Sequence, residues 1–269
     1  MQYEPIKRSL NKLISGSVFI RKIFYRLVDF ILLRTWHVAR ELKKTAGHLP
    51  LQANILDAGC GPGQYTWRMC RMNRKWKVTG VDIDAEQIGE CNDFFKKAGL
   101  GNRASFRTTA LEAFSIPATF DLILSVDVME HIRDDEKVFL NFHESLKAGG
   151  YLIISTPSDQ GGSGTHSDND KSFIDEHVRN GYSKDEITGK LAGAGFSDIK
   201  VKYTYGAPGN ISWHLTMKYP VRMLNISYIF FIILPFYYLV ILPVSFILNI
   251  FDLRINHKRG TGLLITARK

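Results

Sequence analysis

Three alternating glycines between two carboxylates are the clearest chemical signal in this chain. Gly59, Gly61 and Gly63 form a short turn. An apolar run that ends in Asp57 precedes the turn, and a second apolar run ends in Asp82, about 19 residues after it. Glycine lacks the Cβ atom that would hold a ligand away from the backbone. A carboxylate at the end of the second run is placed to accept hydrogen bonds from both hydroxyls of a ribose, so the pattern predicts a nucleoside-binding site.

Positioning these groups requires two buried parallel strands that end side by side. The runs at 54–57 and 78–83 have the length and composition of such strands, and the glycine turn leads into a helix. Ligands of such sheets bind beyond the carboxyl ends of the strands, so we expect an α/β fold with its site there. A dinucleotide-binding domain is the alternative, but its glycines usually follow the spacing GxGxxG.

Two further segments extend the pattern to a known family. Residues 119–132 read TFDLILSVDVMEHI, and residues 146–157 read LKAGGYLIISTP. With the glycine turn, they resemble the class I S-adenosylmethionine (SAM) dependent methyltransferases: the first is similar to the fourth strand and the loop beside the methionine end of SAM, the second to the "LKPGG" turn and fifth strand. The resemblance covers about residues 51–201. Ala148 stands where proline is usual, and Ala110 where an acidic residue is common.

This resemblance implies a Rossmann-like seven-stranded α/β sheet with an antiparallel terminal hairpin, similar to residues 198–205 and 262–268. It implies SAM as methyl donor and S-adenosylhomocysteine (SAH) as product. Because Ala110 lacks a carboxylate, the backbone near Leu111 is the expected contact to adenine. The residues expected to bind the cofactor are Asp57, Gly59, Cys60, Gly61, Gly63, Tyr65, Asp82, Ile83, Leu111, Ser125 and Asp127.

The loop after the fourth strand carries the first candidates for catalysis. His131, next to Glu130, is the first candidate for the general base that an oxygen acceptor needs. The alternative is that it caps the next helix or orients the loop. Asp127, Glu130 and His131 also resemble a run in ubiquinone-pathway O-methyltransferases, where a divalent ion can assist. A metal at these three residues is therefore a second hypothesis, and anchoring of a backbone amide is the alternative.

A polar stretch at 161–182 follows the fifth strand, where acceptor-binding loops are common. His177 is the second candidate for base or ligand, and Tyr182 is a further candidate for the catalytic set. His166 and Arg179 are candidates for acceptor binding. The alternative is that Ser183 merely begins a helix with a capping box and His177 packs beneath it.

The charge is uneven along the chain. The net charge is +9, and residues 1–49 hold ten Lys/Arg against three acidic residues. Between Val18 and Leu42, apolar and basic residues alternate at helical spacing, which predicts a basic amphipathic helix that rests on an anionic membrane surface. The alternative is that its apolar stripe packs on the sheet and its cations are solvated. No nucleic-acid-binding motif is recognisable. Three cysteines without a disulfide framework fit a reducing cytosolic compartment.

A second membrane signal lies near the C-terminus. Residues 226–251 contain no charged side chain, and roughly twenty apolar residues suffice to cross a bilayer core. We expect Pro235 and Pro243 to break this segment and cations to flank it. A single crossing would separate the last strand from its sheet, so we expect a re-entrant or monotopic hairpin with a bend near a proline. The alternative is a buried helical pair that covers the site in a soluble enzyme or a homodimer.

These features define four expected regions: a basic helical arm at 1–49, a SAM-binding core at 50–205, an acceptor lid with the apolar insertion at 206–260, and the final strand at 261–269. The predicted function is methyl transfer, with O-methylation favoured, to a lipophilic acceptor such as a quinone precursor, an isoprenoid or polyketide phenol, or a lipid, at the cytoplasmic membrane face. The expected partners are the lipid surface and the acceptor, with no nucleic acid; a homodimer stays open. A noncatalytic SAM-fold scaffold and a soluble methyltransferase with an apolar lid are the alternatives.

Overall fold

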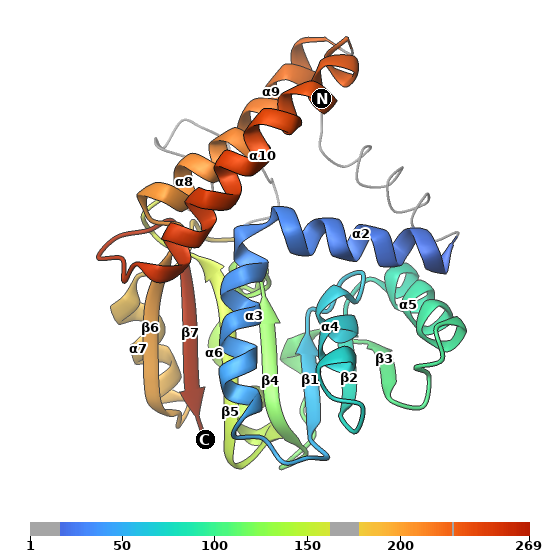
Figure 1. Cartoon of the computed structure of the whole chain (residues 1–269). Coiled ribbons are helices and arrows are strands. Elements are labelled where there is room, and N and C mark those ends of the chain that lie inside the picture. The colour runs from blue at the N-terminus through green and yellow to red at the C-terminus, as the bar shows by residue number, and fades with distance from the viewer. Residues whose placement is uncertain (1–16, 162–177, 228) are drawn as a thin grey trace.

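The computed structural model describes residues 17–161, 178–227 and 229–269, and it places a mixed sheet of seven strands at the centre of this part of the chain (Figure 1). The strands are β1 (Asn54–Ala58), β2 (Lys77–Asp82), β3 (Ala104–Thr108), β4 (Phe120–Val126), β5 (Leu146–Pro157), β6 (Ser197–Thr204) and β7 (Gly262–Arg268). Their order is β3-β2-β1-β4-β5-β7-β6, and β7 runs antiparallel to both of its neighbours. The predicted seven-stranded sheet with an antiparallel terminal hairpin is therefore confirmed.

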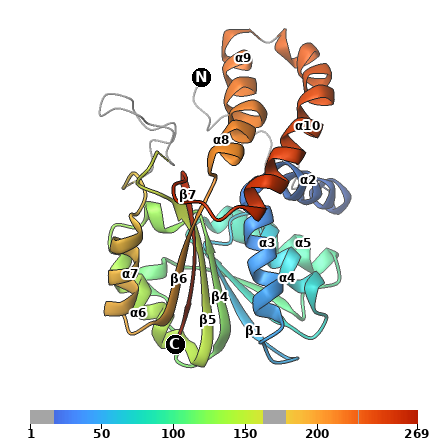
Figure 2. The same cartoon turned by 60° about the vertical axis from the view of Figure 1, so that its left-hand side comes forward.

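Helices cover both faces of the sheet (Figures 1 and 2). The helices are α2 (Val18–Ile31), α3 (Leu33–Ala46), α4 (Gln64–Met72), α5 (Ala85–Lys97), η1 (Leu111–Ala113), η2 (Met129–His131), α6 (Asp135–Ser145), α7 (Lys184–Gly193), α8 (Ala207–Trp213), η3 (His214–Lys218), α9 (Tyr219–Ile226) and α10 (Phe230–Arg254). On one face, Val38 and Leu42 of α3 pack with Ile55 of β1 in a buried cluster. On the other face, Phe139 of α6 packs with Ile123 of β4. Burial of these apolar side chains is the main force that holds the layers together.

The predicted N-terminal helix divides into two. Leu32 has an extended backbone conformation, which ends α2 and begins α3. After this break α3 turns down along the sheet, while α2 crosses above α4 and α5 (Figure 1). The two helices therefore have different roles: α3 belongs to the core, and α2 covers the end of the sheet that carries the glycine turn.

The apolar C-terminal segment forms one arm of a helical hairpin that projects from the sheet (Figure 2). α8, η3 and α9 form the first arm, and α10 returns beside them. The expectation that Pro235 and Pro243 break the segment is wrong, because both lie inside the continuous α10, and the hairpin is formed instead by α9, which ends at Ile226, and α10, which begins at Phe230. Contacts between the arms offset the backbone bonds that the prolines remove: Tyr237 and Tyr238 donate hydrogen bonds to carbonyls of η3 at 2.7 and 2.8 Å.

Candidate active site

The three glycines of the turn between β1 and α4 have different tasks. All three have positive φ angles, which glycine adopts readily. A Cβ atom on Gly59 would lie 2.2 Å from Val128 Cγ2, and one on Gly63 would lie 3.0 Å from the Phe95 ring. The nearest atom to a Cβ on Gly61 would be 3.7 Å away, on Gln87. The outer glycines thus permit close packing, and Gly61 is the one where a ligand can approach the backbone.

Two carboxylates lie beside this turn in different environments. Asp82, at the end of β2, accepts hydrogen bonds from the backbone N–H of Gly61 at 2.8 Å and of Asp84 at 3.1 Å. A carboxylate has about four lone-pair positions, so Asp82 retains acceptor capacity for ribose hydroxyls. Asp57 is 2 % exposed and accepts from Thr66 Oγ1 at 2.6 Å. Burial raises the pKa of Asp57 to about 7.

The other residues predicted to contact the nucleoside occupy both buried and exposed positions. Ile83 follows Asp82 and is 74 % exposed, so its side chain is available to an adenine ring. Leu111 is buried in the core, and its carbonyl accepts a hydrogen bond from Asn141. Cys60 is also buried, which raises the pKa of its thiol, and its N–H donates to Val81 at 3.0 Å. Cys60, Cys70 and Cys91 are all free, as the sequence predicts.

The polar face of α2 packs directly on the glycine turn. Arg21 is 2 % exposed and donates a hydrogen bond to the Pro62 carbonyl at 2.7 Å, and Tyr25 donates to the same oxygen. Asp29 accepts a hydrogen bond from Gln64 at 2.7 Å. The alternative, an apolar stripe packed on the sheet with solvated cations, therefore holds only in part: Val38 and Leu42 of α3 do pack on the sheet and Arg26 is exposed, but Arg21 is buried and the apolar face of α2 is not. A buried arginine faces the protein instead, because backbone carbonyls and the Phe94 ring surround its guanidinium group.

A cluster of polar groups lies at the end of β4, where the sequence resemblance predicts the methionine end of SAM. Ser125, at the end of β4, is fully buried. Ser125 Oγ, Tyr65 Oη and Arg34 Nε are buried atoms without a hydrogen-bond partner among the described residues. The Arg34 guanidinium group forms an ion pair with Asp127, whose φ of 51° is unusual for a residue other than glycine. Unpaired buried polar groups need an explanation, and a ligand with an amino-acid tail would supply partners.

Arg34 was not among the residues expected from the sequence. It lies next to the break between α2 and α3 and meets Asp127 only through the tertiary fold. The available local signal was a basic residue near a helix end, which is too common to indicate a site.

The predicted catalytic residues lie in different environments in the structure. Glu130 is 1 % exposed and accepts a hydrogen bond from Thr156 at 3.1 Å, and burial raises its pKa. His131 ends η2 and is half-buried. Tyr182 is fully buried, and its hydroxyl donates to Asp135 at 2.7 Å, so its prediction as an acceptor-site residue is wrong. The N–H of Tyr182 donates to the Pro157 carbonyl at 3.1 Å, in a bridge that turns the side chain into the core.

Arg179 forms an ion pair with Asp135 and donates to the Ile132 carbonyl at 2.8 Å, so its guanidinium group anchors the loop. His166 and His177 lie outside the residues that the structure describes. The capping role of Ser183 is confirmed, because its side chain accepts from the N–H of Glu186 at the start of α7.

Asp127, Glu130 and His131 do not assemble into a metal site. No group of three or more His, Cys, Asp or Glu side chains with metal-binding geometry occurs within residues 17–161, 178–227 and 229–269. Asp127 is engaged by Arg34, and Glu130 points to Thr156. The hypothesis of a metal at these three residues is therefore not supported by their geometry.

Comparison with known proteins identifies the family. A model of a methyltransferase domain matches residues 52–195, more than half of the chain. The chain belongs to the class I SAM-dependent methyltransferases. This methyltransferase is 31% identical over 109 residues to the ubiquinone biosynthesis O-methyltransferase of Rhizobium leguminosarum bv. trifolii, covering 40% of this chain and 42% of the relative. It is 33% identical over 114 residues to 27-O-demethylrifamycin SV methyltransferase of Amycolatopsis mediterranei, covering 41% and 42%.

Solved structures support the same fold. The methyltransferase superposes on Haemonchus contortus phosphoethanolamine N-methyltransferase 2, in complex with SAM, with a TM-score of 0.62 and 21% identity. The match covers 87% of this chain and 52% of that protein. The two curated relatives are likewise matched over less than half of their length. The sequence similarity is thus confined to about two fifths of this chain, whereas the similarity of fold extends over most of it.

Proposed function

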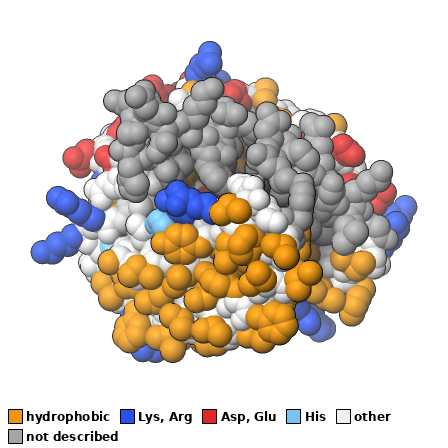
Figure 3. Space-filling view, turned by 90° about the horizontal axis from the view of Figure 1, so that it is seen from above, with side chains coloured by type: hydrophobic (Ala, Val, Ile, Leu, Met, Phe, Trp, Pro, Cys, Tyr) orange, Lys and Arg blue, Asp and Glu red, His pale blue; other side chains and the backbone are white. Residues whose placement is uncertain are grey.

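We propose that this chain transfers the methyl group of SAM to a lipophilic acceptor at the cytoplasmic face of a membrane. The observation that carries the proposal is a broad exposed apolar surface above the donor site (Figure 3). The apolar surface comprises side chains of α2 and α10 that are 39 to 73 % exposed. They are Phe19, Ile20, Ile23, Leu27 and Phe30 of α2, and Phe231, Ile232, Ile233, Phe236, Leu239, Val240, Val244, Phe246, Ile247 and Phe251 of α10.

The two helices join into one surface. Phe30 of α2 stacks on Phe246 of α10 with ring centroids 5.7 Å apart, and Trp36 contacts the same ring at 5.0 Å. Between them lies a groove of about 740 Å³ lined mainly by apolar side chains, including Leu239 and Leu242. Contiguous apolar patches of this size mark sites of interaction with a membrane, a ligand or another protein.

The dimensions and flanking charges favour a membrane. α10 is the one helix in the described part of the chain that is long and apolar enough to cross a bilayer. Only 11% of its most apolar 18-residue stretch is buried. Its 25 residues span about 37 Å. Because α10 returns beside α8 and α9, both ends of the hairpin lie on the same side and β7 can rejoin the sheet (Figure 2). Arg254 ends α10, and Lys258 and Arg259 follow it, where cations favour the cytoplasmic side.

The donor-site geometry suggests a role for each group. Asp82 would bind the ribose hydroxyls, Gly61 would admit the nucleoside to the backbone, and Arg34 would bind the carboxylate of SAM. When bound, SAM supplies an electrophilic methyl group for in-line displacement. The protein then has to align the acceptor and, for an oxygen acceptor, remove its proton. We assign the removal of this proton to His131. Glu130 anchors the loop through its hydrogen bond with Thr156. The relation to an O-methyltransferase of ubiquinone biosynthesis supports an oxygen acceptor.

Vesicle sedimentation tests the membrane role. The full chain should sediment with vesicles that contain anionic phospholipid. The double variant Phe236→Lys with Leu239→Lys should bind these vesicles at least tenfold more weakly. The matched control is Leu140→Lys, which alters an exposed leucine of α6 outside the apolar surface. Equal vesicle binding by the double variant and the control would refute the membrane role.

Turnover separates the enzyme from its alternatives. Tritiated methyl from SAM should enter a lipid extract, and His131→Ala should remove the incorporation while SAH binding remains. SAH binding without incorporation from any extract would favour a noncatalytic scaffold. A stable dimer whose interface contains α10, with no vesicle binding, would instead assign the apolar surface to a second copy of the chain.

A further inference from the structure

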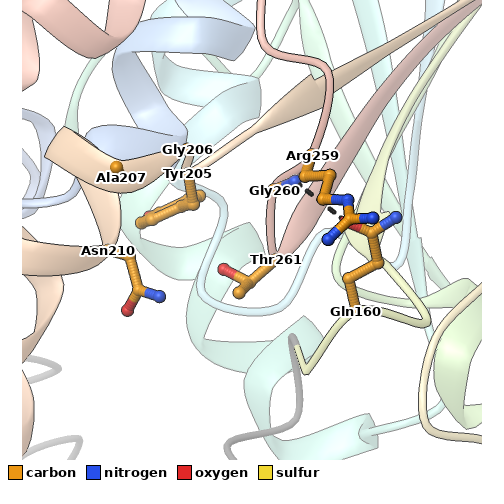
Figure 4. Close-up of a pocket in the computed structure, with 8 residues that line it drawn as sticks. All are labelled: Gln160, Tyr205, Gly206, Ala207, Asn210, Arg259, Gly260 and Thr261. Carbon is orange, nitrogen blue, oxygen red and sulfur yellow. Dashed lines mark hydrogen bonds between the residues drawn. The ribbon is translucent and has the colours of Figure 1, made fainter.

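A polar pocket lies at the base of the hairpin, separate from the apolar groove. It has a volume of about 480 Å³ and forms where β6 leads into α8 and where the chain enters β7. Side chains of Gln160, Tyr205, Asn210, Arg259 and Thr261 line it (Figure 4). The pocket therefore combines one cation with amide and hydroxyl groups, beneath a surface that is otherwise apolar.

This pocket is connected to the donor site through Arg34. The Tyr205 hydroxyl in the pocket accepts a hydrogen bond from the N–H of Arg34 at 2.9 Å. The guanidinium group of Arg34 pairs with Asp127 at the end of β4. Two residues, Tyr205 and Arg34, thus connect the pocket with the predicted methionine end of the donor.

Three polar side chains in the pocket have donor capacity to spare. Within residues 17–161, 178–227 and 229–269, no carboxylate forms an ion pair with Arg259. Asn210 uses its backbone groups in the arm, while its side-chain amide points into the open space of Figure 4. The Thr261 side chain lies between Asn210 and Arg259 in the same view (Figure 4). Guanidinium, amide and hydroxyl donors together suit an anion with several oxygens.

A basic stripe extends from the pocket along the first arm of the hairpin. His214, Lys218 and Arg222 follow Asn210 at intervals of four residues. His214 Nδ1 donates to the Asn210 carbonyl at 2.8 Å, and Lys218 Nζ lies 3.3 Å from His214 Nε2. The sequence from 206 to 251 contains no Asp or Glu. Asp252, near the end of α10, accepts a hydrogen bond from the Gly209 N–H at 3.0 Å and forms ion pairs with His37 and His257 rather than with this stripe.

We propose that the polar pocket binds the phosphate group of the methyl acceptor, which makes the acceptor an anionic lipid with a phosphate ester. Arg259 contacts the phosphate in a bidentate manner, and Asn210 and Thr261 complete its hydrogen bonds. The stripe of His214, Lys218 and Arg222 attracts the same headgroup from the membrane surface. This assignment rests on the proposed function, since it names the acceptor class for that site.

Calorimetry with a soluble lipid tests the assignment on the full chain. The probe is dihexanoyl phosphatidic acid below its micelle concentration, compared with dihexanoylglycerol, which lacks the phosphate, and with inorganic phosphate, which lacks the chains. We expect dihexanoyl phosphatidic acid to bind at least tenfold more tightly than either. Equal affinity for dihexanoylglycerol would overturn the phosphate site, and equal affinity for inorganic phosphate would overturn the lipid as its source.

Two variants and one control locate the bound phosphate. Arg259→Gln should weaken binding of dihexanoyl phosphatidic acid at least tenfold, while Lys258→Gln, which removes the neighbouring exposed cation outside the pocket, should change it less than twofold. Asn210→Asp, which adds a negative charge to the pocket, should weaken binding to a similar extent and gives a second test if Arg259→Gln folds poorly. Equal effects of Arg259→Gln and Lys258→Gln would overturn the pocket as the binding site.

SAH binding and vesicle sedimentation separate this inference from the function on which it rests. Loss of the phosphate preference in a chain that still binds SAH and vesicles would reject the pocket alone. A chain that binds dihexanoyl phosphatidic acid through Arg259 but does not sediment with vesicles would reject the membrane role and leave the phosphate site in place.

Discussion

Asp57→Asn provides a sharp test of the electrostatics beneath the glycine turn. Asp57 is buried under the donor site, and burial raises its pKa from 3.8 to about 7. In the unfolded chain it releases its proton near the ordinary value, so between about pH 4 and pH 7 the folded state holds more protons. The free energy of unfolding therefore falls as the pH rises through this window and levels off above it.

The size of this effect follows from the two pKa values. The difference between the two pKa values lowers the free energy of unfolding by about 4 kcal/mol at pH 8, and by about 1.5 kcal/mol at pH 5, where Asp57 is ionised only in the unfolded chain. Asparagine has the same shape and can still accept the hydrogen bond from Thr66. The stability of Asp57→Asn relative to the parent should thus increase by about 2.5 kcal/mol between pH 5 and pH 8.

Urea unfolding of both proteins at pH 5 and pH 8, without SAM or SAH, measures this difference. Asp135→Asn is the control of opposite kind. Burial alone would raise the pKa of Asp135, but hydrogen bonds from Lys190 and Tyr182 and the charge of Arg179 outweigh it and lower the pKa. Its stabilisation is lost only as the pH falls below about 4, so the effect of Asp135→Asn should be the same at pH 5 and pH 8. A constant effect for Asp57→Asn would refute the reasoning.

Three further substitutions test the donor site and the core. Asp82→Ala should raise the dissociation constant of SAH at least tenfold because the ribose hydroxyls lose a charged acceptor; calorimetry measures this, and unchanged affinity would contradict the assignment. Arg34→Met should weaken SAH binding roughly tenfold to a hundredfold, because a charge-assisted hydrogen bond is lost. Lys43→Met, at the exposed end of α3, should leave SAH binding unchanged. Tyr182→Phe should lower the free energy of unfolding by about 1–3 kcal/mol and leave kcat unchanged, and a collapse of kcat would return Tyr182 to the active site.

The sequence predicted those parts of the molecule that depend on local patterns. Strands β1 and β2 are short apolar runs that end at a carboxylate or turn, and the structure places Asp82 at the end of β2 as expected. The antiparallel pair β6 and β7 agrees with the predicted segments to within about one residue. Alternation, glycine spacing and chain reversal are encoded within a few residues, so they are readable without the fold.

The parts that were missed depend on contacts between distant residues. The periodicity of α2 predicts two faces, but only the Pro62 carbonyl, far along the chain, decides that Arg21 faces inward. Arg34 became a site residue through its pairing with Asp127. Tyr182 looked like a loop residue beside the site, yet its bridge to the segment after β5 directs it into the core.

α2 lies between the donor turn and the surroundings of the protein. Its inner side chains, Arg21 and Tyr25, share the carbonyl of Pro62 within the turn, and most of its outer side chains are apolar, with Arg26 among them. If those outer side chains rest on lipid, a change of bilayer thickness or a switch to detergent shifts a helix that directly supports the turn. Dissociation constants of SAM measured in detergent and in bilayers would then describe two different states of the same enzyme. Their ratio would report how strongly the lipid contact of α2 affects the turn.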